Sequence, residues 1–153
     1  MNEPAHFTWL RSKLGLHAIP GPKDNSEIVS WFKFTSLDRS EWHDSTPWCA
    51  VTQNAALGLN GEKGTGSAAA LSFSTWGHEV DWTDALPGDM VVFEWTDADG
   101  NVTGHHVAQF VSQQGNFVTC IGGNQLDRPT GFHEISIKTF GKDSVINVRR
   151  AKT

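Results

Sequence analysis

The chain has 153 residues, of which 38% are hydrophobic and 19% are charged. This is the size of one ordinary domain with enough apolar side chains for a core, which excludes a disordered chain. The net charge is −5, and no basic run extends beyond Arg149-Arg150, which disfavours a nucleic-acid-binding protein. No apolar stretch approaches the roughly 18 residues of a membrane span. We therefore expect one monomeric domain over residues 1–153, without nucleic acid or membrane as a partner.

The first half of the chain has the pattern of helices. Residues 4–14 place apolar side chains three and four positions apart, and the capping box at 24–27 opens a second helix that we expect to reach about Leu37. A threonine followed by a proline suits the start of a third helix, which we place at about 48–57. A short fourth helix is predicted at 68–76.

The second half of the chain has the pattern of strands, because the apolar period shortens from residue 89 onward. A hairpin turn is predicted at 97–101. Helices followed by strands predict an α+β fold, in which N-terminal helices pack on an antiparallel sheet of about five strands. The expected strands are 90–95, 106–111, 117–121, 134–137 and 145–149.

Cys49 lies at the predicted start of the third helix. A thiol attacks as the thiolate, and the N–H groups and positive end of a helix lower the pKa of a cysteine placed there. Position alone leaves open the commoner role of a buried free thiol. The other cysteine, Cys120, is expected within a strand, and two cysteines do not imply a disulfide.

A cysteine nucleophile also needs a base, and histidine suits this role at neutral pH. His105 and His106 open a predicted strand directly after the turn at 100–104. A third polar group usually orients the imidazole. Asn124 follows the next strand and would lie beside His106 if the two strands pair, although taken alone it is better explained as a turn residue.

Five short motifs follow one another along the chain, and each is weak alone. In this order and spacing they resemble small CHAP-like members of the NlpC/P60 superfamily, which are bacterial and phage cell-wall peptidases and amidases. The resemblance extends back to Ile19-Pro20-Gly21-Pro22 with Asn25, so it covers nearly the whole chain. The five motifs are Pro47-Trp48-Cys49, Gly64-Thr65-Gly66-Ser67-Ala68, Pro87-Gly88-Asp89-Met90-Val91-Val92-Phe93, His106-Val107 and Gly122-Gly123-Asn124-Gln125.

The resemblance implies a papain-like fold and acyl transfer without a cofactor or metal. It assigns Cys49 as the nucleophile, His106 as the base and Asn124 as the group that orients the base. The usual family run is similar to Gly-His-Val-Gly, whereas here two histidines precede Val107. We prefer His106 over His105 because it directly precedes this valine. The backbone N–H of Cys49 is a natural oxyanion donor at a helix start.

The implied substrate is bacterial peptidoglycan, with Trp48, Ser67 and Trp76 as candidate cleft residues that also have structural explanations. We expect a cut within the stem peptide, and an N-acetylmuramoyl-L-alanine amidase of the same fold is the alternative. A glycosidase is disfavoured because the acidic residues fall mostly in loops without a pairing signal. A metal hydrolase is disfavoured because the seven histidines form no ligand motif.

The sequence leaves three biological settings open, namely a phage lysin, a secreted effector and a housekeeping enzyme. The first residues show no basic segment before an apolar run, so no Sec signal peptide is expected. The enzyme would then reach the wall after lysis, as a phage endolysin, or by specialised secretion, as an antibacterial toxin with a protein inhibitor. A non-catalytic cell-wall binding module is the alternative of a different class, and the seven tryptophans are compatible with it.

Overall fold

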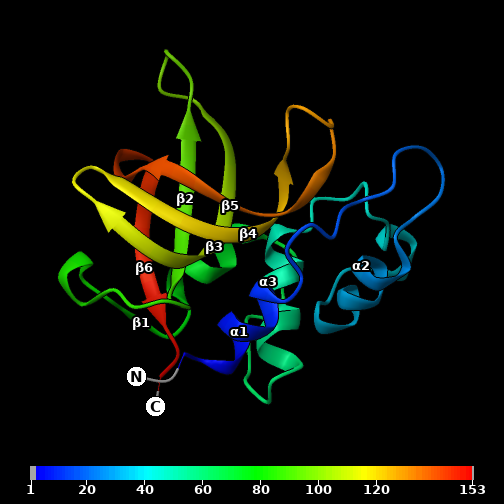
Figure 1. Ribbon diagram of the computed structural model, residues 1–153, viewed down its shortest axis with the longest axis horizontal. Coiled ribbons are helices and arrows are strands. Elements are labelled where there is room, and N and C mark those ends of the chain that lie inside the picture. The colour runs from blue at the N-terminus through cyan, green and yellow to red at the C-terminus, as the bar shows by residue number, and fades with distance from the viewer. Residues whose placement is uncertain (1–2, 153) are drawn as a thin grey trace.

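One antiparallel sheet forms the larger layer of the computed structural model, which describes residues 3–152 (Figure 1). The strand order is β1-β6-β2-β3-β4-β5, and every neighbouring pair is antiparallel. The strands are β1 (His78–Glu79), β2 (Met90–Thr96), β3 (Val102–Gln114), β4 (Phe117–Leu126), β5 (His133–Gly141) and β6 (Val145–Arg150).

Three α-helices gather on one side of this sheet (Figure 1). They are α1 (Ala5–Arg11), α2 (Ser26–Trp31) and α3 (Cys49–Gly58). None of the helices within residues 3–152 combines the length and apolar character needed to cross a membrane. Short 3-10 turns connect the elements: η1 (Phe32–Phe34), η2 (Arg39–Glu41), η3 (Ala70–Thr75), η4 (Trp82–Asp84) and η5 (Lys142–Ser144).

The α+β class and the antiparallel sheet predicted from the sequence are confirmed, with differences in detail. The second helix ends at Trp31 and continues as the 3-10 turn η1, short of the expected end at about Leu37. The sheet has six strands because the two-residue β1 pairs with the end of β6. The expected fourth helix is the 3-10 turn η3. The second helix starts one residue later than the capping box indicated, because the side chain of Asn25 accepts the N–H groups of Glu27 and Ile28.

The central element is α3, which lies between the sheet and the other helices. Nine of its ten residues are buried, and its side chains are mostly small or apolar on all faces. A helix surrounded by protein on all sides has this composition, in contrast to a surface helix with one polar face. The first residue of the helix, Cys49, is therefore fixed in position by the side chains packed around it.

Gly123 allows the first turn of α3 to approach β4 closely. A Cβ atom at Gly123 would lie 2.2 Å from Oγ1 of Thr52 and 2.7 Å from the ring of Trp48. Any larger residue would therefore push the helix away from the strand. Gly123 of the fifth motif thus has a packing role, which is to bring the start of α3 close to β4.

Candidate active site

Cys49 and His106 meet where the start of α3 lies against β3. Both are almost completely buried, with exposed fractions of 7% and 8%. Burial alone would raise the pKa of the Cys49 thiol, but the interaction with the His106 imidazole, helped by the N–H groups of Val107 and Ala50, lowers the pKa below its ordinary value. The thiol therefore loses its proton more readily than a free cysteine does.

The same contact acts on the imidazole in the opposite direction. Burial alone would lower the pKa of His106, yet the contacts with Cys49 and then Gln125 raise it above the ordinary value, against a smaller opposing effect of Lys138. A thiol with a lowered pKa beside an imidazole with a raised pKa favours the thiolate–imidazolium pair. This is the activated form of a cysteine nucleophile.

Gln125 supplies the third side chain of the site. Its Oε1 lies 3.0 Å from Nε2 of His106, while its Nε2 donates to the carbonyl and the hydroxyl of Ser136, both at 2.8 Å. A carbonyl can only accept, so the contact with Ser136 fixes which end of the amide faces the imidazole. The Nε2 of His106 must then carry a hydrogen, which leaves Nδ1 to exchange the proton with Cys49.

The position beside His106 was predicted for Asn124, and the structure corrects this to Gln125. Strands β3 and β4 do pair, and their register at Gln109 and Ile121, if continued, would set Asn124 opposite His106. However, β4 bulges between Gly122 and Gln125, and Asn124 adopts a φ of 56°. The extra residue shifts the alternation of side chains by one, so that Gln125 takes the face that Asn124 would have had.

A second glycine gives Gln125 the space it needs. A Cβ atom at Gly122 would lie 2.8 Å from Oε1 of Gln125 and 2.9 Å from Cβ of Ala108. The side-chain amide of Gln125 therefore occupies the space that a Cβ atom at position 122 would fill. The run Gly122-Gly123-Asn124-Gln125 thus contains one glycine for the helix, one for the amide and one residue for the bulge.

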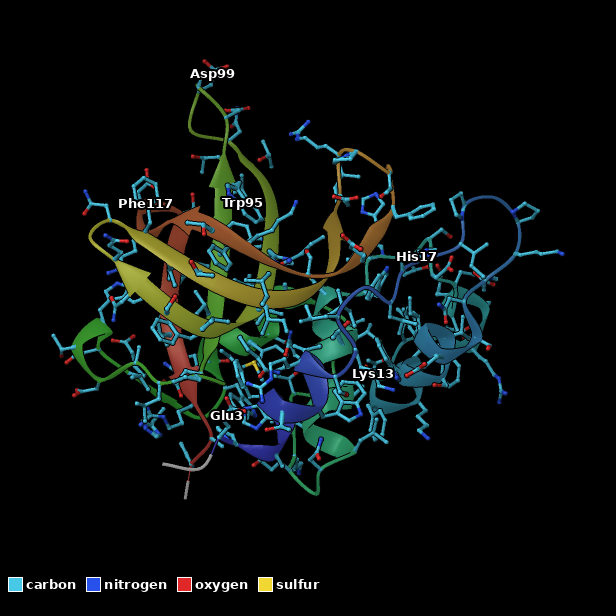
Figure 2. The ribbon with its side chains drawn as sticks, in the orientation of Figure 1. Glu3, Lys13, His17, Trp95, Asp99 and Phe117 are labelled. Atoms are coloured by element: carbon cyan, nitrogen blue, oxygen red, sulfur yellow. The ribbon has the colours of Figure 1, made fainter. Side chains whose placement is uncertain are left out.

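The adjacent histidine has a different environment. His105 lies opposite Glu94 in the pairing of β2 with β3, and its Nε2 is 2.9 Å from the carboxylate of that residue. His106 points to the other face, where three aromatic rings surround it at centroid distances of 5.9 to 6.0 Å. These rings are Phe93, Trp95 and Phe140, and Figure 2 shows Trp95 at the base of the hairpin that carries Asp99.

The start of α3 also provides a donor for an oxyanion. The first bond of the helix runs from the N–H of Thr52 to the carbonyl of Trp48, at 2.9 Å. The N–H of Cys49 precedes that bond and has no acceptor within residues 3–152. Unpaired N–H groups at a helix start can stabilise a negative oxygen next to the nucleophile.

The three candidate cleft residues lie in different places. Trp48 is 0% exposed and packs beside Trp31, with ring centroids 6.3 Å apart, so the structure corrects its predicted place in a substrate cleft. Ser67 caps a turn, where its hydroxyl accepts the N–H of Ala69. Trp76 lines a groove together with Glu62. Glu62 follows the C-terminal end of α3, whereas Cys49 is at the start of that helix.

The remaining candidates for chemistry can be placed directly. Cys120 is a free thiol in the core, where burial raises its pKa, so it stays protonated and inert. Residues 3–152 contain no cluster of three or more His, Cys, Asp or Glu side chains arranged to hold a metal ion. Of the two cysteines, Cys49 is the one with a lowered pKa.

Neither a scan against protein-family models nor a search of curated proteins gives a match to this chain. The superfamily resemblance of the five motifs stays a prediction. The residue that the sequence missed is Gln125, although two glycines directly before two amide residues are a signal for a bulge at this point.

Proposed function

We propose that this protein is a cysteine hydrolase that cuts an amide bond of bacterial peptidoglycan. The observation that carries the proposal is the chain of contacts from Cys49 to His106 to Gln125. His106 lowers the pKa of Cys49, and Gln125 orients His106 and raises its pKa. The order of motifs around Cys49 and His106, which resembles small CHAP-like hydrolases, supports a papain-like assignment and a cell-wall substrate.

The reaction proceeds by acyl transfer. The thiolate of Cys49 attacks the amide carbonyl, and the resulting oxyanion is stabilised by the N–H of the same residue. The Nδ1–H of the His106 imidazolium then gives its proton to the leaving amine, which departs and leaves a thioester. His106 then takes a proton from a water molecule as its oxygen attacks the thioester. The carbon–sulfur bond breaks, the carboxylic acid product leaves, and the thiolate–imidazolium pair is restored. Gln125 holds the ring in the tautomer that both steps require.

The proposed bond lies inside the stem peptide, and the amide between the stem and the muramic acid lactyl group is the alternative. Both are planar carbonyl amides, which suit a thiolate with an imidazole. A glycosidic bond requires two carboxylates across the sugar linkage. Among the acidic residues near His106, Glu94 is engaged with His105.

The test follows the turbidity of purified peptidoglycan with the wild-type protein and the Cys49→Ala variant. We expect the wild type to clear the suspension and the variant, folded by circular dichroism, to be slower by several orders of magnitude. Activity should survive a chelator and be lost with a thiol alkylator. Equal clearing by both proteins would refute the catalytic role. No clearing by either, with retained binding to the wall, would indicate a non-catalytic module.

A further inference from the structure

A groove of about 460 Å³ lies at the end of α3 that is remote from Cys49. Its wall is largely apolar and includes Pro4, Trp76, Leu86 and Pro87. Glu62 is tied to the last turn of α3, because its N–H donates to the carbonyl of Leu57 at 2.9 Å. α3 is about 15 Å long, with Cys49 at its first residue and the backbone that leads to Glu62 at its last turn.

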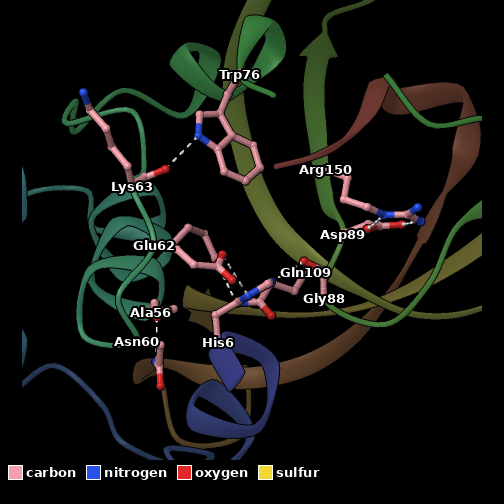
Figure 3. Close-up of polar contacts among 11 residues, drawn as sticks. His6, Ala56, Asn60, Glu62, Lys63, Trp76, Gly88, Asp89, Gln109 and Arg150 are labelled. Atoms are coloured by element: carbon pink, nitrogen blue, oxygen red, sulfur yellow. Dashed lines mark hydrogen bonds and ion pairs between the residues drawn. The ribbon is translucent and has the colours of Figure 1, made fainter. Parts of the chain in front are cut away.

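Two polar side chains, His6 and Glu62, face each other in the wall of this groove. His6 is 8% exposed, and its Nε2 lies 2.8 Å from the carbonyl of Gly88. Because a carbonyl only accepts, this Nε2 carries a hydrogen, and in the neutral ring Nδ1 is a lone pair. That Nδ1 is buried, has no hydrogen-bond partner within residues 3–152, and lies 3.5 Å from the carboxylate of Glu62 (Figure 3).

The groove also has one negative charge in excess. Arg150 lines it, but its guanidinium is held by Asp89 through two bonds of 2.7 Å. Glu3 lines it as well and is paired with Arg11. The carboxylate of Glu62 is 39% exposed in its side chain and has only His6 within ion-pair distance among the described residues.

These features select one class of ligand. The lone pair on Nδ1 of His6 and the carboxylate of Glu62 are best satisfied together by a cation that has several N–H donors. A primary ammonium group has both properties. The negative end of the α3 dipole acts in the same direction. The apolar wall with the ring of Trp76 suits the methylene chain that carries such an ammonium.

We propose that this groove is a binding site for an aliphatic primary ammonium on a peptide, that is, a lysine-type side chain. The ammonium donates to Nδ1 of His6 and to the carboxylate of Glu62, and its methylenes lie against Trp76 and Pro87. The site is distinct from the Cys49 centre, and the proposal does not depend on the proposed hydrolysis.

The test measures binding of Nα-acetyl-lysine amide to the Cys49→Ala variant by NMR, using the indole N–H signal of Trp76 as the reporter. The measurement is made at a pH of about 8, where the lysine side chain carries its positive charge. A ligand of this size should bind with a Kd on the order of 1 mM. Nα-acetyl-norleucine amide, which has the same chain without the ammonium, should bind about tenfold more weakly.

The added substitution Glu62→Gln keeps the shape of the groove and removes its charge, so it should weaken the lysine amide about tenfold. Asp99→Asn makes the same change of charge at the exposed hairpin tip and should leave binding unchanged (Figure 2). The proposal is overturned if the lysine amide causes no saturable shift, if norleucine amide binds equally well, or if Glu62→Gln has no effect. None of these outcomes bears on hydrolysis, because the protein tested lacks the Cys49 thiol.

Discussion

Nε2 of His106 and Oε1 of Gln125 lie 3.0 Å apart across the bulge of β4. Since the amide is fixed at its other end by the carbonyl of Ser136, this contact determines the tautomer of the imidazole and leaves Nδ1 as the nitrogen that can exchange a proton with Cys49. The orientation of the base thus depends on a single amide and on the glycine that makes room for it.

Gln125→Ala should lower kcat by about 10- to 100-fold and leave KM nearly unchanged, because the amide orients the base without contacting the substrate. Asn124→Gly is the matched control, since glycine adopts the φ of 56° at that position without strain. It should keep near-normal activity. Steady-state kinetics with folded variants would decide the matter, and the reverse ranking would return the orienting role to Asn124.

His106→Ala should be about as damaging as Cys49→Ala, because nucleophile and base act as one unit. His105→Ala should cost much less activity, since this ring contacts Glu94 on the other face of β3. Turnover of peptidoglycan by each variant is the measurement. A greater loss from His105→Ala than from His106→Ala would move the base to His105.

The rate of alkylation by iodoacetamide should reveal the lowered pKa of Cys49. In the wild type the thiolate forms at a lower pH than for an ordinary cysteine, whose pKa is about 8.5. His106→Ala removes the group that lowers this pKa and leaves the burial that raises it, so the midpoint should move to a higher pH than in the wild type. Cys120, which is buried with a raised pKa, should stay unlabelled in the folded protein. Identical pH profiles for the two proteins would contradict the thiolate–imidazolium pair.

Gly123→Ala should destabilise the protein by about 1–3 kcal/mol, because its methyl group would overlap Oγ1 of Thr52. Gly104→Ala is the control, since a Cβ atom there meets nothing within 4 Å. Urea unfolding gives both values. Adding Thr52→Ala to Gly123→Ala should recover part of the loss, and no difference between the two glycines would mean that the approach of α3 to β4 is not as close as described.

The chemistry of the site was partly predictable from the sequence. Cys49 was placed at a helix start by the threonine and proline before it, and His106 at a strand by the change of period, so local signals located both residues. Their meeting depends on tertiary packing through Gly123, which no local pattern encodes. The sequence resemblance was needed to pair them.

The structure places Asn124 and Trp48 differently from the sequence prediction, for physical reasons. If side chains alternated regularly along β4, the side chain of Asn124 would lie on the same face as His106. The bulge shifts this alternation by one residue, so the side chain of Gln125 lies there instead. Trp48 precedes the nucleophile and was a natural cleft residue, yet its ring fills the core between α3 and β4. A large aromatic ring gains more free energy in the core than on the surface.

The products of peptidoglycan digestion test the central claim most directly. Muropeptides from walls treated with the wild-type protein or with Cys49→Ala would be compared by mass spectrometry. We predict new amino groups within the stem peptide in the wild-type digest only, and free intact stem peptide would instead indicate the amidase. New reducing sugar ends, or the same products from Cys49→Ala, would contradict amide hydrolysis by Cys49.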